Sequence, residues 1–139
     1  MGGSDNTGLG LTFETVAHAI GYLTDAEYID RVSLTLRSLA DETPGFKIQR
    51  SKNGWMANFN NSYTGASNNI KGMMPTGLST AGALFVKTYV SKTLPSEFAE
   101  INRLVSKIWN SINFDSLLCD KDGTYNPNGE YIPMVTTDL

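Results

Sequence analysis

Carboxylates are the first residues to consider as catalytic groups in this chain. Hydrolysis of a glycosidic bond needs two carboxyl groups at the scissile bond, one protonated and one ionised. Most acids here fit other positions: Glu97 and Glu100 a solvent-exposed helix face, Glu27 a helix cap. Glu14 is the catalytic candidate that remains. The alternative is that Glu14 is a carboxylate near a helix N-terminus, where it interacts favourably with the helix dipole.

An aromatic–amide cluster is the second candidate site. Trp55 is followed within a few residues by Asn58 and Asn60, with Asn61 and Tyr63 beside them. Sugars bind by stacking their C–H faces on aromatic rings and by hydrogen bonding to a few well-placed polar groups such as amides. We therefore name Trp55, Asn58 and Asn60 as substrate-binding candidates. The alternative is that Trp55 belongs to the core and that the asparagines form a turn.

Other chemistries have less support in the sequence. The chain has a single histidine, His18, and a single cysteine, Cys119. We interpret His18 as structural and Cys119 as a buried thiol, because the sequence identifies no catalytic partner for either. The acidic segment 120–124 lacks the ligand spacing of a calcium-binding EF-hand, and no nucleotide-binding motif is present. We expect no metal site and no cofactor.

Length and charge limit the class of protein. The 139 residues correspond to one domain, which we place at 11–139 after a glycine-rich, flexible leader at 1–10. The net charge of −3 and the lack of a basic cluster argue against binding to nucleic acid. No apolar run reaches the ~18 residues that indicate a transmembrane helix, so we expect no membrane span.

Two helices are predicted in the first forty residues. Helical spacing of apolar residues predicts a first helix over about 12–22. Its apolar stripe consists of Phe13, Val16, Ala17 and Ile20. Thr24 and Glu27 have the spacing of a capping box, which predicts a second helix that runs to about residue 40. The short connection requires the two helices to be antiparallel.

A hairpin and a second helix pair are predicted to follow. Alternating residues at 46–50 and 55–59 flank the turn dipeptide Asn53-Gly54. Residues 60–78 are rich in Asn, Ser, Gly and Thr, and we interpret them as a loop. Ser79 or Thr80 is expected to cap a third helix that ends near residue 89. Pro95 predicts the start of a fourth helix. Its apolar stripe consists of Phe98, Ile101, Val105, Ile108 and Ile112.

These elements predict an all-α fold of antiparallel helix pairs with a small β-hairpin insert. Ser79 and Thr80 are further substrate-binding candidates in that fold. Backbone N–H groups at a helix start are free of intrahelical partners, and there they can hold a hydroxyl or an anion.

Several short motifs resemble the glycoamylase-like domain family. They are Gly8-Leu9-Gly10-Leu11-Thr12, Gly54-Trp55-Met56-Ala57-Asn58-Phe59, Thr64-Gly65, Ser79-Thr80 with Ala83-Leu84, and Ile108-Trp109 before Ile112-Asn113-Phe114. The family has an (α/α) toroid fold and includes enzymes that act on β-1,2-glucans and domains of cyclic β-glucan synthases. The resemblance, which covers about Gly8 to Cys119, implies a partial (α/α) toroid and an oligo- or polysaccharide partner. It also implies an extracytoplasmic location, periplasmic or secreted, because such relatives are usually exported.

The chain departs from the family pattern at two positions. Asn58 stands where the family commonly has His, and Gly82 where it commonly has Asp. A glycine can neither donate a proton nor orient a sugar. The resemblance therefore implies a glycan-interacting domain whose glycoside hydrolase activity is impaired. The chain is also shorter than the family domain and would form about half of a toroid.

Two other functions fit the same residues. A non-catalytic carbohydrate-binding module would keep the aromatic–amide cluster and would need no pair of acids. A helical interaction domain that self-associates is the second alternative, because an open half-toroid would leave apolar helix faces uncovered.

Overall fold

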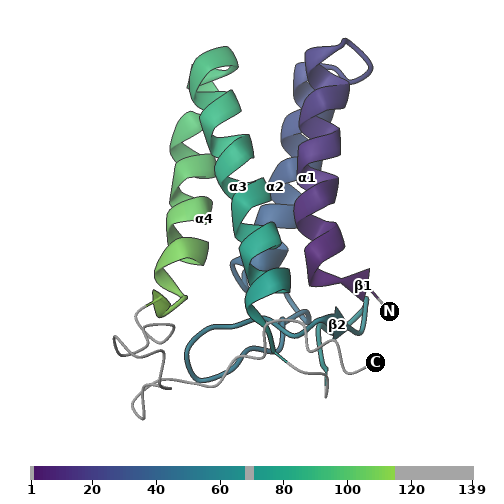
Figure 1. Ribbon diagram of the computed structural model, residues 1–139. Helices are drawn as coiled ribbons and strands as arrows, with labels where there is room; N and C mark the ends of the chain where they lie inside the picture. Colours follow the sequence, from purple (N-terminus) through teal and green to yellow (C-terminus); the bar gives the residue numbers. More distant parts are fainter. Residues whose placement is uncertain (1, 68–70, 115–139) are drawn as a thin grey trace.

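The computed structural model describes residues 2–67 and 71–114, which form four α-helices with a small sheet at one end (Figure 1). The all-α prediction, with a small β element, is confirmed. In chain order the elements are β1 (Gly2–Gly3), α1 (Ser4–Ala19), α2 (Asp25–Leu39), β2 (Phe59–Asn60), α3 (Met73–Thr93), the 3-10 turn η1 (Pro95–Glu97) and α4 (Phe98–Asn110).

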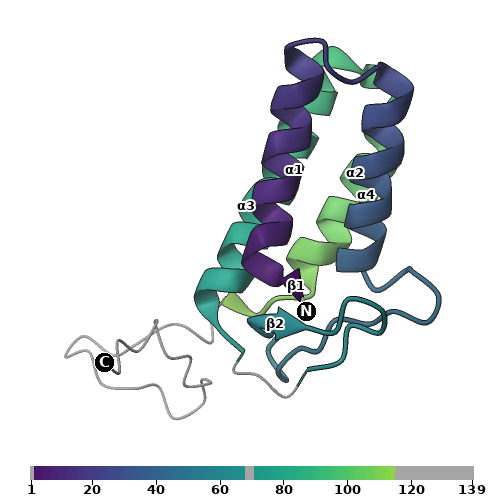
Figure 2. The ribbon, with the colours of Figure 1, turned by 90° about the vertical axis from the view of Figure 1, so that its right-hand side faces the viewer.

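The four helices form two layers. Helices α1 and α3 make one layer, and α2 and α4 make the other (Figures 1 and 2). Within the first layer the helices run in the same direction, because Ser4 contacts Ser79 at one end and His18 contacts Tyr89 at the other. Helix α1 is followed by its antiparallel partner α2, and α3 by α4, as the short connections within each pair predicted. The apolar core lies between the layers.

Helices α2 and α4 pack as the sequence predicts, and α2 also begins where the capping box places it. Pro95 starts the 3-10 turn η1, so α4 itself begins three residues later than predicted, at Phe98. The capping box is present: the Glu27 backbone N–H donates to the Thr24 hydroxyl, and the Thr24 N–H donates to the Glu27 carboxylate. The predicted stripe of α4 is buried at Ile101, Val105 and Ile108. Both helices carry charged residues on the side away from the core, so their apolar positions identify the buried face unambiguously.

The prediction for the start of α1 was wrong. This helix begins at Ser4, not near residue 12, so most of the expected flexible leader is helical. The Ser4 N–H donates to the Asn58 carbonyl (3.1 Å) and its hydroxyl to the Ala57 carbonyl (2.8 Å), which fixes the first turn. Gly8 then lies against α3, where an added Cβ would be 2.8 Å from the Cα of Ser79. The early glycines thus permit close helix packing rather than flexibility.

The prediction for α3 was also wrong at its start. The helix begins at Met73 and ends at Thr93, so the last third of the expected loop is helical. Pro75 lies in the first turn of α3. Proline is tolerated there, because the N–H that it lacks would have no intrahelical acceptor.

The small sheet differs from the predicted hairpin in its partners. Strand β2 pairs antiparallel with β1 at the start of the chain, with Gly3 opposite Phe59. The predicted hairpin is present as an isolated antiparallel bridge between Arg50 and Met56. The turn between them is closed by the Ser51 N–H, which donates to the Trp55 carbonyl at 2.9 Å. Both features place the insert beside the N-terminal ends of α1 and α3 (Figure 1).

Some expectations lie outside the described residues. They concern Cys119 and the segment 120–124. In the described part of the chain, no helix has the length and apolarity that crossing a membrane requires.

Candidate functional site

Trp55, the aromatic residue predicted to stack against a sugar, is not on the surface. Only 1% of the Trp55 side chain is exposed. Its ring lies edge-on to Phe114, with the ring centroids 6.0 Å apart. A sugar stacks on an open aromatic face, and Trp55 offers none in this fold. Its burial agrees with the alternative interpretation, in which Trp55 is a core residue of the insert.

The structure does not place Ser79 and Thr80 at a helix start. Both side chains are buried in the middle of α3. The Ser79 hydroxyl donates to the Ser4 carbonyl of α1, and the Thr80 hydroxyl donates to the Thr76 carbonyl at 2.7 Å. Free backbone N–H groups occur only in the first turn of a helix. The predicted N–H site for a hydroxyl or an anion therefore does not form at these residues.

Asn58 and Asn60 lie close to the start of α1. Asn58 is half-buried, and its carbonyl accepts from the Ser4 N–H. Asn60 is 6% exposed, and its Nδ2 donates to the Ser4 hydroxyl (2.7 Å) and the Ala57 carbonyl (3.3 Å). The Oδ1 atom of Asn60 is buried and accepts no hydrogen bond within the described structure. An unpaired buried acceptor is costly, so a hydrogen-bond donor that reached this oxygen would stabilise the site.

Asn60 also lines a small pocket. Its volume is about 200 Å³, and no charged side chain lines it. The lining residues are Gly2, Gly3, Ser4, Thr7, Phe46, Ile48, Asn60, Asn61 and Ser62. We call it the Asn60 pocket. Hydroxyl, amide and apolar groups together suit a small neutral polar ligand better than an ion.

Glu14 lies in the middle of α1, facing α2, and not at the helix start. Desolvation raises the pKa of its carboxyl group, and the positive charge of Arg31 opposes that rise. Its Oε2 atom is buried without a hydrogen-bond partner in the described structure. A raised pKa suits a general acid. However, no second carboxylate contributes to the pKa shift of Glu14, as a close catalytic pair would.

His18 joins three helices at the closed end of the bundle. Its Nε2 is 2.8 Å from the Asp25 carboxylate of α2, and its Nδ1 is 2.9 Å from the Tyr89 hydroxyl of α3. Its ring stacks on Tyr28, with centroids 4.6 Å apart. The Tyr28 hydroxyl lies 3.0 Å from that of Thr15, and burial raises the pKa of Tyr28 to about 12. Both ring nitrogens of His18 are engaged by neighbouring helices, which agrees with our interpretation of His18 as structural.

The most extensive unusual feature is an exposed apolar surface on α1 and α3. Its α1 residues were predicted as the packed stripe of the helix, which was wrong. The stripe at Phe13, Val16 and Ile20 is exposed, whereas the buried face of α1 consists of Ser4, Gly8, Leu11 and Thr15. A similar exposed row follows α3 at Met74, Leu78 and Phe85. No exposed residue at 6–20 or 74–88 is charged. We call this surface, with Leu9, the uncharged face; it turns away from α2 and α4.

The sequence does contain a signal for the uncharged face. Between residues 6 and 13, and again between 73 and 86, there is no charged side chain. A helix that is apolar all round is typical of one that is covered on every side. Over these stretches α1 and α3 carry apolar residues on their outer sides as well, although those sides are uncovered in the described structure.

Neither a metal site among the described residues nor a known relative identifies the function of this site. Among residues 2–67 and 71–114, no group of three His, Cys, Asp or Glu side chains is placed to hold a metal ion. No protein-family model, curated protein or solved structure matches this chain. Membership of the glycoamylase-like family therefore stays a prediction from the short motifs.

Proposed function

We propose that this chain is a helical interaction domain that self-associates through the uncharged face. The observation that carries the proposal is that no exposed residue at 6–20, along α1, or at 74–88, along α3, is charged; the exposed Lys92 of α3 lies beyond that stretch. Soluble monomers rarely expose large contiguous apolar patches, and those that do commonly use them to bind a partner. Phe13 and Phe85 are 70% and 46% exposed. These two rings alone present on the order of 200 Å² of apolar surface.

A second copy of the chain fits this face better than a charged partner. In a two-fold symmetric dimer each residue meets the same surface on the other copy. Like charges would repel in that arrangement, and this face has none among its exposed residues. Gly77 and Ala81 are exposed on the same stretch of α3, and such small residues allow another helix to pack closely.

Substitution on the two opposite layers tests the proposal. Light scattering coupled to size exclusion should detect a concentration-dependent dimer of the unaltered chain. Phe13→Asp should abolish it, because a carboxylate would be buried without a partner. Leu34→Asp is the matched control, since Leu34 is 62% exposed but lies on α2. A chain that stays monomeric at high concentration would overturn the proposal.

A second function, binding of a neutral saccharide, is favoured by the Asn60 pocket. The buried Oδ1 of Asn60 lacks a donor in the described structure, and the pocket is lined by hydroxyl and amide groups. A sugar hydroxyl would supply that donor. This proposal keeps Asn60 from the predicted glycan residues, needs no exposed Trp55, and requires no pair of acids.

Calorimetry with β-1,2-, β-1,3- and α-1,4-gluco-oligosaccharides tests saccharide binding, and assay of released sugar tests hydrolysis. Binding should shift the NMR signals of the Asn60 side-chain amide. Any sugar release should disappear in Glu14→Gln while binding persists. The absence of both heat and shifts would contradict a glycan function for this chain.

A further inference from the structure

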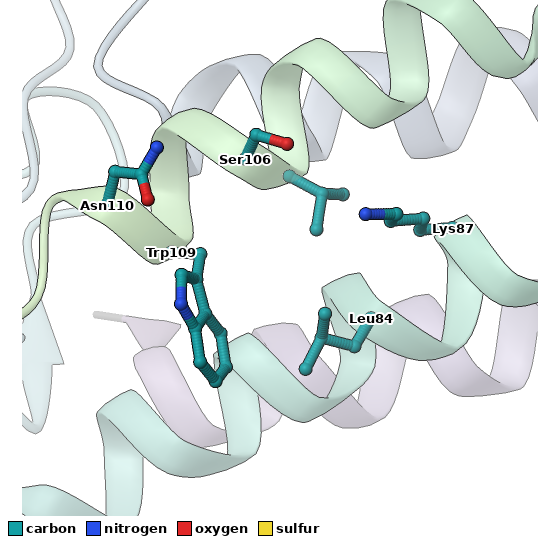
Figure 3. A pocket seen from close by; sticks show the side chains of 6 residues that line it. Leu84, Lys87, Ser106, Trp109 and Asn110 are labelled. Carbon is teal, nitrogen blue, oxygen red and sulfur yellow. The ribbon is translucent and has the colours of Figure 1, made fainter. Parts of the chain in front are cut away.

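A separate pocket lies between α3 and α4, on the flank of the bundle (Figure 3). Its volume is about 290 Å³, close to the ~300 Å³ at which small-molecule sites begin. It is lined by Leu84 and Lys87 of α3 and by Val105, Ser106, Trp109 and Asn110 of α4. None of these residues was a predicted site residue.

The pocket presents an open aromatic surface that is held in place. Trp109 is 44% exposed, whereas Trp55 is buried. The Trp109 ring packs against Phe114 at a centroid distance of 4.7 Å, which limits its rotation. Leu84 and Val105 add an apolar surface beside the indole. A flat apolar ring entering here would gain both apolar burial and ring–ring contact.

A single positive charge lies at the other end of the pocket. In Figure 3 the Lys87 ammonium group and the Trp109 ring approach from opposite sides, with Leu84 between them. Lys87 forms no ion pair within the described structure, whereas Arg103 and Lys107 on α4 are both paired with Glu42. The hydroxyl of Ser106 and the amide of Asn110 also lack a partner among the described residues and line the same space.

We propose that this pocket binds a small aromatic carboxylate, with the ring against Trp109 and the carboxylate on Lys87. An ammonium–carboxylate hydrogen bond is stronger than a neutral one, and Ser106 can donate to the second carboxylate oxygen. A saccharide fits less well: Ser106 and Asn110 could bind some of its hydroxyl groups, but those on the Leu84 and Val105 side would lose water without gaining partners. The site is independent of the uncharged face, so either proposal can fail without the other.

NMR of the two tryptophan indole N–H groups tests this proposal directly. Titration with benzoate should shift the Trp109 signal and leave the buried Trp55 signal unchanged as an internal reference. Benzamide has the same shape without the charge and should bind about tenfold more weakly, the loss expected for one charge-assisted hydrogen bond. Methyl glucuronide carries the charge on a hydroxylated ring and should also bind more weakly than benzoate.

Variants separate the two halves of the site. Trp109→Leu should abolish benzoate binding. Lys87→Met should weaken it about tenfold and remove the preference over benzamide, whereas Lys92→Met, on the same helix outside the pocket, should have no effect. Phe13→Asp should leave benzoate binding unchanged. The proposal is overturned if benzoate at tens of millimolar leaves Trp109 unshifted, if benzamide binds equally well, or if methyl glucuronide binds more tightly.

Discussion

The two helix layers have opposite outer surfaces. On the α2 and α4 side, Glu42 accepts hydrogen bonds from Arg103 and Lys107 at 2.8 Å each, and Arg37 lies 3.4 Å from Glu100. On the α1 and α3 side, the exposed residues at 6–20 and 74–88 include no charge at all. The outer surface of α2 and α4 therefore has the charged composition of a surface in contact with water. The outer surface of α1 and α3 has the composition of a surface that is covered by other protein.

The layers also differ in how their helices meet. In the first layer α1 and α3 approach through Gly8 and Gly82, where an added Cβ on Gly82 would be 2.8 Å from the Cα of Gly8. In the second layer long charged side chains connect α2 and the segment after it to α4. The position that carries an acid in the resembled family is thus occupied here by a glycine that the packing requires.

The largest expected effect comes from filling the α1–α3 contact. Gly8→Ala would place a Cβ 2.8 Å from the Cα of Ser79 and still closer to the Leu78 carbonyl, and neither backbone atom can move freely. We expect a loss of about 3 kcal/mol or more in the free energy of unfolding, at the upper end of overpacking costs. Urea denaturation followed by circular dichroism would measure it.

Gly10→Ala is the matched control on the same helix, because nothing lies within 4 Å of its added Cβ. It should stabilise the protein by about 0.5–1 kcal/mol, since alanine is the better helix former. Equal effects of the two substitutions would contradict close packing at Gly8.

The next effect concerns the uncharged face. If a second copy covers it, the melting temperature of the unaltered chain should rise with protein concentration, because association stabilises the folded state. In Phe13→Asp this dependence should vanish, with a loss of about 1.5–3 kcal/mol in association free energy per buried side chain. Scanning calorimetry at several concentrations would measure both. A melting temperature that does not depend on concentration in either protein would show that the face stays uncovered.

The same contrast explains which helices the sequence predicted well. Helices α2 and α4 carry both charged and apolar positions, so their apolar stripes and buried faces follow from the pattern, and the Thr24 capping box also fixes the start of α2. Helices α1 and α3 lack that contrast. Their glycines and Pro75 resemble loop residues, although Gly8 and Gly82 are required by a contact some seventy residues apart in sequence. Tertiary packing overrides local propensity there, and a single sequence does not reveal it.

The candidate sites were predicted less well for a related reason. Residue type identified Trp55, Ser79 and Thr80 as groups able to bind sugars, but burial and internal hydrogen bonds occupy all three. The Oδ1 atom of Asn60 is unpaired, while its Nδ2 donates to the Ser4 hydroxyl. This contact could not be predicted, because Ser4 was not predicted to lie in a helix. The α3–α4 pocket depends on the crossing of two helices. No spacing within either helix encodes that crossing.

A smaller effect should come from Glu14, the carboxyl group within the first layer. Desolvation raises its pKa, so the folded state binds this proton more tightly than the unfolded state does. Stability should therefore fall as pH rises from about 4.5 through the raised pKa. Glu14→Gln should remove that dependence and stabilise the protein at neutral pH by about 0.5–1 kcal/mol. Urea melts between pH 4 and 8 would measure it, and an unchanged pH profile in the variant would exclude this role.

The smallest effect should come from Glu42, the carboxylate that pairs with Arg103 and Lys107 of α4. Its effect on the pH dependence of stability is opposite in sign to that of Glu14. Hydrogen bonds from Arg103 and Lys107 lower the pKa of Glu42 to about 2. Its contribution is therefore fully present above the unfolded value of about 4.5 and is lost as pH falls towards 2. The group is exposed, so salt should screen the effect. Glu42→Gln should flatten the acid limb of the stability profile at low salt and leave it unaltered at high salt. An effect that persists in molar salt would mean that the α2–α4 surface is held by packing rather than by its charges.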